Sequence, residues 1–205
     1  MFDLIISDSK WSESHGAEGN HLGMGIMYYA IPYVLKAQHC VCLGSGAGFV
    51  PKLMHRAQSQ LIEESIISSH KITLIDANIG PWGLPVYQEG IDGYPEITLI
   101  KSITDDAVQL VDNIDYLHVD ADHTYDQVLN DFNNYLSKMN GDNWAITVHD
   151  TYNFSDADHP PIGSYQAAID FSQANDLYFT NFRIGCGTGL IMPRRKFETL
   201  GIFNF

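Results

Sequence analysis

The sequence predicts an α/β protein with a mostly parallel seven-stranded sheet, an antiparallel C-terminal β-hairpin strand, and helices on both faces. Three observations support this prediction. Short apolar runs typical of buried strands alternate with longer segments of helical periodicity. A glycine-rich turn at 44–48 joins the first of these strands to a helix. A second turn at 185–188 separates the last two strand-like runs, which predicts a hairpin and so an antiparallel last strand.

The expected elements alternate along the chain. Residues 22–36 carry helical periodicity and predict an N-terminal helix. The predicted strands are the apolar runs 40–44, 72–76, 97–101, 115–120, 144–149, 177–184 and 189–193. The predicted helices between them are 51–67, 105–111, 125–139 and 164–174. We expect a single domain over residues 1–205, with an N-terminal helical cover segment at 1–36 and a core at 40–193.

Composition favours one soluble, cytoplasmic domain. The chain has 205 residues and 45% hydrophobic content, which is enough for a sizeable core. Residues 1–10 lack the basic start of a signal peptide, and the longest apolar stretch, 24–35, is too short to span a bilayer. The formal net charge of −14 opposes nucleic-acid binding, because a phosphate backbone would be repelled. The cysteines lack C-x-x-C spacing, so we expect reduced thiols and no zinc site built from them: Cys40, Cys42 and Cys186.

The glycine-rich turn is the first candidate binding site. Gly44, Gly46 and Gly48 let the backbone approach a ligand closely, and the free N–H groups of the following helix would face that ligand. Asp76, at the end of the second strand, could accept hydrogen bonds from both hydroxyls of a ribose. A dinucleotide-binding loop would have its third glycine at position 49, so Phe49 disfavours a nicotinamide cofactor. A simpler alternative is that the glycines form only a tight turn and that Asp76 is a turn residue.

Acidic and histidine residues follow the fourth and fifth predicted strands. The fourth strand ends in Asp120-Ala121-Asp122-His123, and the fifth ends in His149-Asp150. Because the carboxyl ends of parallel strands meet at one edge of a sheet, we expect these side chains to lie close together. Carboxylate and imidazole donors suit magnesium, manganese or iron better than they suit a thiolate-bound zinc. Two simpler alternatives stay open: Asp122 or Asp126 caps the next helix, and His149 is a satisfied core histidine.

Together these motifs resemble the class I S-adenosylmethionine-dependent methyltransferases, whose fold is Rossmann-like. The run Val119 to His123, followed by a helix and then by His149-Asp150-Thr151, is similar to the metal-dependent O-methyltransferases of the macrolide-sugar, caffeoyl-CoA, catechol and methyltransferase domain 24 types. The chain departs from their usual pattern by placing a histidine before Asp150. The resemblance implies the following cofactor-binding residues: Gly44, Ser45, Gly46, Gly48, Asp76, Ala77, Ser102 and Asp120. It implies Asp120, His149 and Asp150 as metal ligands, and His123, with Asp122 as the other candidate, as the catalytic base.

The implied function is O-methylation of a small hydroxylated acceptor, such as a sugar, a glycan unit or a catechol-like ring. S-adenosylmethionine would be the methyl donor, and a divalent metal, expected to be magnesium, would assist. His123 is the favoured base because the unperturbed pKa of histidine is about 6.5. We expect no nucleic-acid or membrane partner, and homo-oligomer formation is left open. Two rival hypotheses are a metal-dependent hydroxylase on the same fold and a catalytically silent module that binds the cofactor or a nucleoside.

Two further segments are candidates for contact with the substrate. Residues 12–21 are polar and glycine-rich, so His15, Glu18 and His21 either touch the substrate or belong to a solvated lead-in. Residues 153–163 follow the predicted metal-binding strand and form a long irregular loop. Because long loops at a functional edge often carry recognition residues, this loop is the favoured acceptor-binding segment.

Overall fold

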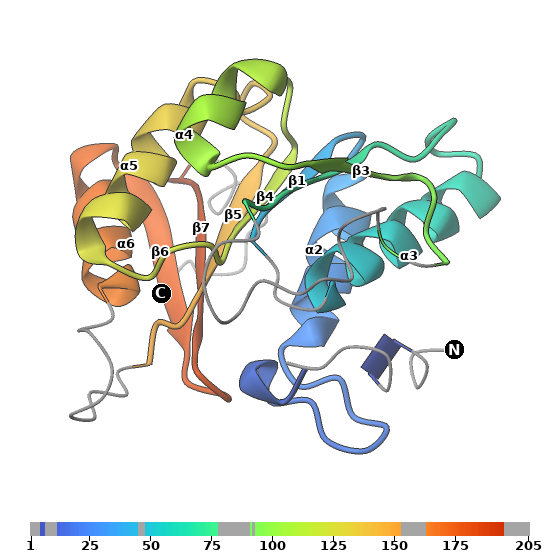
Figure 1. Cartoon of the computed structure of the whole chain (residues 1–205), viewed down its shortest axis with the longest axis horizontal. Coiled ribbons are helices and arrows are strands. Elements are labelled where there is room, and N and C mark those ends of the chain that lie inside the picture. Colours follow the sequence, from blue (N-terminus) through green and yellow to red (C-terminus); the bar gives the residue numbers. More distant parts are fainter. Residues whose placement is uncertain are drawn as a thin grey trace.

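The computed structural model describes residues 5–6, 12–44, 48–77, 91, 93–152 and 163–194. Its seven strands form one sheet in the order β3-β2-β1-β4-β5-β7-β6 (Figure 1). The strands are β1 Cys40–Leu43, β2 Ile72–Ile75, β3 Ile97–Ile100, β4 Tyr116–Val119, β5 Ala145–His149, β6 Leu177–Phe182 and β7 Thr188–Pro193. The first five run parallel, whereas β7 pairs antiparallel with both β5 and β6. The predicted fold class is therefore confirmed, including the antiparallel hairpin.

Helices cover both faces of the sheet. They are η1 Ser12–His15, α2 Gly25–Leu35, α3 Phe49–Glu63, α4 Thr104–Ala107, η3 Val108–Leu110, α5 Tyr125–Leu136 and α6 Ser164–Ala174. Figure 1 shows α2 and α3 on one side of the sheet and α4, α5 and α6 on the other. Among the described residues, no helix combines the length and the apolar character that a membrane span requires.

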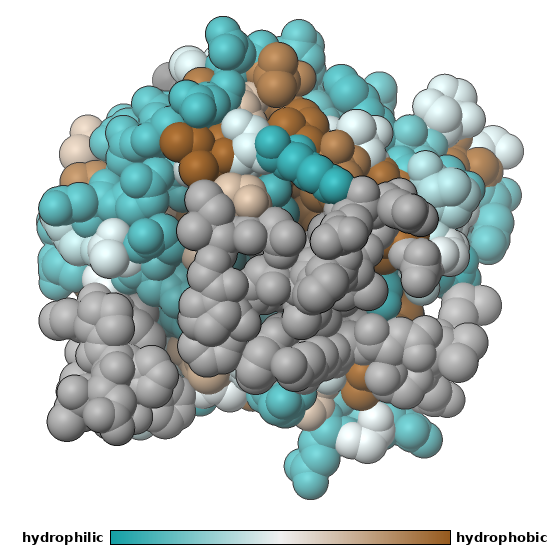
Figure 2. All heavy atoms as spheres, viewed as in Figure 1, coloured by the Kyte–Doolittle hydropathy of each residue, from teal (hydrophilic) through white to brown (hydrophobic). Residues whose placement is uncertain are grey.

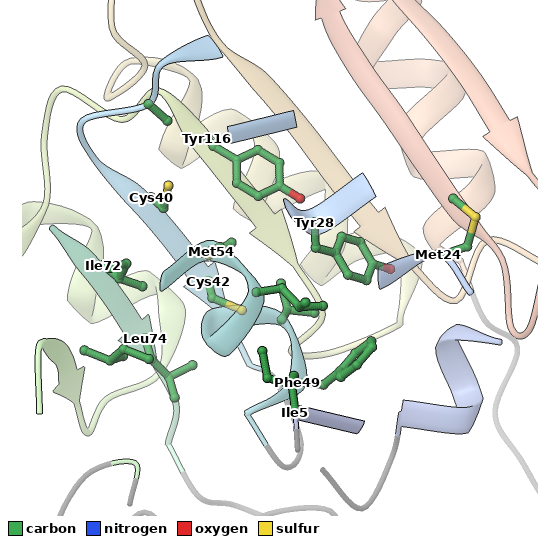
Figure 3. Close-up of a cluster of buried hydrophobic side chains, with 14 of the residues drawn as sticks. Ile5, Met24, Tyr28, Cys40, Cys42, Phe49, Met54, Ile72, Leu74 and Tyr116 are labelled. Atoms are coloured by element: carbon green, nitrogen blue, oxygen red, sulfur yellow. The ribbon is translucent and has the colours of Figure 1, made fainter. Parts of the chain in front are cut away.

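The central strands β1, β2, β4 and β5 bury both of their faces. Cys40 and Cys42 of β1 belong to the core beneath α2 and α3, whereas Val41 and Leu43 belong to the core beneath α4, α5 and α6. This division follows from the pleat, because successive side chains of a strand point to opposite faces. Figure 3 shows the first core, where Phe49 at the start of α3 lies beside Tyr28 of α2. Continuous apolar runs of this kind are typical of parallel strands covered on both sides.

The outer helices are amphipathic. Val128, Phe132 and Tyr135 of α5 are buried at helical spacing, and they pack with Phe171 of α6. On the face seen in Figure 2, mainly hydrophilic residues lie over α5 and α6. These helices therefore have their apolar stripe against the sheet and their polar side outward.

The structure corrects several predicted boundaries. The helix predicted at 51–67 begins at Phe49, because Gly48 adopts a left-handed conformation and ends the loop, and it stops at Glu63, before Ser65 with φ 58°. The helix predicted at 105–111 is one turn of α4 followed by the 3-10 turn η3. The other elements start or end within three residues of the prediction. Periodicity locates elements well, but their ends depend on single backbone conformations.

Candidate active site

The candidate site lies at the carboxyl ends of the parallel strands. Leu43 of β1 is in register with Ile75 of β2 and with Val119 of β4, and Val119 is in register with Val148 of β5. The residues that follow these strands therefore meet along one edge of the sheet: Gly44, Asp76, Asp120 and Asp150. This is the edge where open α/β sheets bind their ligands.

Position 44 requires glycine because of its backbone conformation and its packing against the backbone of Asp120. Its φ is +64°, and a Cβ at this position would lie 2.4 Å from the carbonyl oxygen of Asp120. The backbone N–H of Gly44 donates to Ile75 O at 2.8 Å, and that of Asp120 donates to Leu43 O at 2.8 Å. The sequence argument expected this glycine to make room for a ligand. The space that its Cβ would occupy is taken by the backbone that carries Asp120, and the contact with a ligand stays a prediction.

The other predicted cofactor residues stay predictions. Gly48 has φ 80° and caps the start of α3. Asp76 and Ala77 follow β2 and Ser102 follows β3, all three half-buried at the same edge. Ser45 and Gly46 lie outside the described residues.

Asp120 is the centre of a cluster of histidines. Its Oδ1 lies 3.1 Å from His149 Nδ1 and 3.4 Å from His123 Nε2, and its Oδ2 lies 3.8 Å from His118 Nε2. Burial alone would raise the pKa of Asp120, but the charge of His149 and the proximity of all three imidazoles hold this pKa well below its usual range. The carboxyl group is therefore an anion at neutral pH.

His123 lies between two carboxyl groups. Its Nδ1 is 3.0 Å from Asp150 Oδ2, and its Nε2 faces Asp120 on the other side. Burial opposes the charged form, but these two acids outweigh burial and raise the pKa of His123 to about 10. The ring is therefore an imidazolium at neutral pH. The sequence argument favoured His123 as a base because of the unperturbed pKa of histidine; the raised pKa removes that reason, and the catalytic role of His123 stays a prediction.

His149 is a buried histidine that contacts an acid, rather than a simple core histidine. Its Nδ1 faces Asp120, and its Nε2 lies 3.3 Å from Ser14 O. Both ring nitrogens therefore face hydrogen-bond acceptors. Burial opposes the charge, but Asp120 and Asp150 raise the pKa of His149 above its ordinary value.

Asp150 has an unusual backbone. Its φ is 55°, in the left-handed region that aspartate adopts more readily than most residues. The following residues are held by β6 and the turn after it: Tyr152 N–H donates to Cys186 O at 2.9 Å, and Thr151 Oγ1 donates to Asn181 Oδ1 at 2.6 Å. A sparsely populated conformation maintained beside a charged cluster is typical of functional sites.

Asp122 has a different position from its neighbours. It is exposed, and its Oδ1 accepts a hydrogen bond from Thr124 N–H at 2.7 Å. This contact stabilises the turn before α5 but does not cap the helix, because Thr124 is itself the N-cap residue and no side chain caps this helix. His123, not Asp122, is the residue of this pair that contacts Asp120 and Asp150.

The sequence argument missed two residues of the cluster. His15 was left as either a substrate contact or part of a solvated lead-in; it is only 2% exposed, and its ring lies 3.9 Å from that of His149 between centroids. His118 is fully buried in β4, where its Nδ1 lies 2.8 Å from Thr147 Oγ1. A polar residue inside an apolar strand was the available signal for His118. The only signal for His15 was its place in the polar, glycine-rich segment 12–21, which named it as a candidate substrate contact and not as part of the histidine cluster.

The N-terminal segment is fixed to the hairpin turn, which explains how His15 enters the site. Ser14 O accepts a hydrogen bond from Cys186 N–H at 2.7 Å, and a Cβ on Gly185 would lie 2.2 Å from that same carbonyl oxygen. Tyr28 OH lies 3.0 Å from His15 Nδ1 and 2.9 Å from Thr188 Oγ1. Burial lowers the pKa of His15 well below its ordinary value, so this ring is neutral. Glu18 and His21 of the same segment are exposed.

The donor set fits a divalent metal ion. Two groups of three donor residues, each with ligand atoms within 4.8 Å of one another, share Asp120: one adds His123 and Asp150, the other adds His15 and His149. His118 Nε2 and His123 Nε2 are buried without a hydrogen-bond partner in the described part of the chain. The predicted ligands are thus divided between the two groups.

The acceptor loop predicted at 153–163 lies outside the described residues except for Gly163, whose N–H donates to His123 O at 2.7 Å.

Comparison with known proteins agrees with this architecture. A family model described as a methyltransferase domain matches residues 41–151. Among solved structures, an SAH-bound methyltransferase, PaMTH1 of Podospora anserina, has a TM-score of 0.65 at 13% identity, with 94% of this chain and 88% of that chain covered.

Two further solved structures are similar. The SAH complex of an O-methyltransferase from Bacillus cereus has a TM-score of 0.63 at 10% identity, covering 88% and 83% of the two chains. TomG of Streptomyces achromogenes, an O-methyltransferase in tomaymycin synthesis crystallised with SAM, has a TM-score of 0.59 at 14% identity, covering 93% and 90%. No curated protein matches the chain.

Proposed function

The chain belongs to the family of methyltransferase domains, and from this premise we propose that it transfers a methyl group from S-adenosylmethionine to a hydroxyl oxygen of a small acceptor. The observation that carries the proposal is the pair of carboxyl groups, Asp120 and Asp150, that holds His123 at the carboxyl edge of the sheet. Similar solved structures contain SAM or SAH, which supports the choice of donor. A sugar, a glycan unit or a catechol-like ring is the expected type of acceptor.

The cofactor would lie against β1, β2 and the start of α3. S-adenosylmethionine supplies a methyl group on a positively charged sulfur. Asp76 is half-buried at the end of β2, where its carboxyl group can accept hydrogen bonds from ribose hydroxyls. Gly48 begins α3 with a positive φ, so the first N–H groups of this helix face the same edge. Ser102 and Ala77 follow the neighbouring strands and would border the adenosine.

The metal ligands would be Asp120, His149 and Asp150. A divalent ion bound there supplies positive charge that lowers the pKa of an acceptor hydroxyl. His123 is protonated next to these acids, and the acids also raise the pKa of His149. Metal ligands must be deprotonated, so metal binding should release protons. We expect magnesium, because two of the three donor residues in the group Asp120, His123 and Asp150 are carboxylates.

His123 would control the proton of the acceptor. The transfer breaks the bond from sulfur to the methyl carbon and forms a bond from that carbon to oxygen, while the hydroxyl proton must leave. With its pKa near 10, His123 already carries a proton and cannot accept another. Its pKa depends on the charges of Asp120 and Asp150, so neutralising those charges would lower it and make the ring a competent base. A cation bound to Asp120 and Asp150 would thus lower the pKa of His123 and allow it to act as the base.

Calorimetric titration with SAH tests the cofactor. We expect micromolar binding that Asp76→Ala weakens at least about tenfold and that Asp142→Ala, an exposed acid in the turn before β5, leaves unchanged. Repeating the titration with magnesium and with a chelator separates the cofactor from the metal. Transfer of a labelled methyl group to candidate sugars and catechols then tests the reaction. No SAH binding under either condition would overturn the proposal.

A second candidate function rests on the group of donors that contains His15, Asp120 and His149. His15, His149 and Asp120 are two histidines and one carboxylate, the set used by non-haem iron oxygenases. This group favours the rival hypothesis of an oxygen-dependent hydroxylase on the same fold. The decisive comparison loads the protein anaerobically with Fe²⁺, then adds oxygen, acceptor and a two-electron reductant, because the second oxygen atom of O₂ must be reduced to water. Hydroxylated product that disappears in His15→Ala would support this candidate, whereas methylated product formed without oxygen would exclude it.

A further inference from the structure

A second group of metal-binding side chains lies away from the candidate active site. His55, His70 and Glu96 each offer a ligand atom, and these atoms lie within 4.8 Å of one another. His70 comes two residues before β2, and Glu96 comes directly before β3. These two strands are parallel neighbours, with Ile72 in register with Ile97, so His70 and Glu96 meet at the amino ends of the strands. The cluster is therefore at the opposite edge of the sheet from Asp120.

We propose that His55, His70 and Glu96 form a zinc site that joins α3 to the starts of β2 and β3. Two imidazoles and one carboxylate are a donor set that zinc uses in proteins, with further positions left to water. Zinc is preferred to magnesium because two of the three donors are nitrogens. The absence of a cysteine motif does not bear on this site, since it contains no thiolate.

The contacts within the cluster bring the donors together. His55 Nε2 lies 3.2 Å from Glu96 Oε2, and the His55 and His70 rings are stacked with centroids 4.2 Å apart and planes 3° from parallel. Tyr94 packs edge-on against His55, with ring centroids 5.1 Å apart. Lone pairs of parallel rings do not converge on one point, so ion binding requires one ring to turn. His70 is half-buried in the connection before β2, where rotation of its ring does not disturb a helix or strand.

Ser59 orients His70. Its hydroxyl donates to His55 O at 2.9 Å, so its contact with His70 Nε2, also 2.9 Å, requires that nitrogen to be the donor. In the neutral ring the lone pair is then on Nδ1 of His70. Metal-binding histidines usually donate their other N–H to a neighbouring group in this way, which fixes the tautomer. Ser59 is on α3 one helical turn after His55, so the same helix supplies a ligand and its support.

Exposure and charge favour access by a cation. The side chain of Glu96 is 46% exposed and that of His55 is 16% exposed, so an ion can enter from solvent. The net charge of the chain is −14, which raises the local concentration of cations at its surface. A zinc ion here would connect α3, which follows the glycine-rich turn, with β2, which carries Asp76. The site would thus stabilise the two elements that flank the proposed cofactor position, without taking part in the reaction.

The test measures zinc affinity by competition with a zinc-indicator dye. Asp120→Asn is the background, because Asp120 belongs to both groups of the other cluster and an asparagine preserves its shape. In this background we expect one zinc per chain. His70→Asn and Glu96→Gln should each weaken binding at least about tenfold, and Ser59→Ala about tenfold. The matched control is Glu63→Gln, an exposed acid on the same helix, which should leave zinc binding unchanged.

A second measurement covers the case in which a histidine variant folds poorly. X-ray absorption of the zinc-loaded Asp120→Asn protein should show two imidazole ligands, and Glu96→Gln, at an exposed position, should keep its circular dichroism spectrum. Zinc that binds equally to His70→Asn and Glu96→Gln, or no zinc binding in the background variant, would overturn the proposal. Neither result depends on methyl transfer, so the site and the proposed function are tested separately.

Discussion

Two buried carboxyl groups of this protein have opposite chemistry. Asp120, at the edge of the sheet, is surrounded by three histidines, and these hold its pKa well below the ordinary value. Asp131, on the buried side of α5, has Thr104 and Gln127 as neutral partners. Burial raises the pKa of Asp131 to about 6, and its Oδ2 has no hydrogen-bond partner among the described residues. Burial therefore does not decide the charge of a carboxyl group; the partners that the fold brings to it do.

The largest effect is expected from breaking the Asp120 cluster. Asp120→Ala removes the acceptor that His149 and His123 face, and leaves His149 buried without its partner. We expect methyl transfer to fall at least about 10³-fold and stability to fall by about 3 kcal/mol. Urea unfolding and initial rates with labelled S-adenosylmethionine measure the two losses. Retained activity in Asp120→Ala, with Asp142→Ala as the control, would contradict the proposed role of the cluster.

The role of His123 is tested against its exposed neighbour. His123→Gln should lower kcat by about 10²- to 10⁴-fold, the usual contribution of an acid or base catalyst. Asp122→Asn should keep kcat close to wild type, because the asparagine oxygen can still accept the hydrogen bond from Thr124 N–H. Steady-state kinetics on both variants distinguish the two candidates. Equal losses in the two variants would show that Asp122 acts in the reaction.

The energetic effect of the close packing between Gly44 and the backbone of Asp120 can be measured separately. Gly44→Ala must accommodate a positive φ and a clash with Asp120 O, whereas Gly141→Ala has a similar φ of +55° and open space around its Cβ. We expect Gly44→Ala to lose about 3 kcal/mol of stability and Gly141→Ala about 1 kcal/mol. Denaturant titration gives both values. Similar losses would mean that the left-handed conformation alone requires glycine at 44.

The smallest effect concerns Asp131 and its pH dependence. Its folded-state pKa of about 6 lies above that of the unfolded chain, about 3.9. Its contribution to stability is therefore fully present below about pH 4 and is lost as pH rises through about 6. We expect Asp131→Asn to remove this loss, so that wild-type stability falls by about 2 kcal/mol relative to the variant between pH 4 and 7. Parallel urea titrations at several pH values check this; curves that stay parallel would show an unshifted Asp131.

The sequence by itself determined the order of the elements and the residues at the strand ends. Alternating apolar runs locate β1 to β5, because the strands of a covered parallel sheet are mostly apolar. The same pattern places Asp76, Asp120 and Asp150 at one edge, since parallel strands end together. These inferences are local, or need only the rule for parallel sheets. This is why the fold and the strand-end acids could be predicted.

Only the tertiary structure decided how the site is completed and charged. His15 reaches His149 because the carbonyl oxygen of Ser14 accepts a hydrogen bond from the turn between β6 and β7. This is a contact between distant parts of the chain. The pKa of His123 is raised because Asp150 approaches it from another strand. Periodicity and motif spacing describe neighbours along the chain, whereas electrostatic energies depend on distances in space. Ligand sets and protonation states therefore emerge only when the chain is folded.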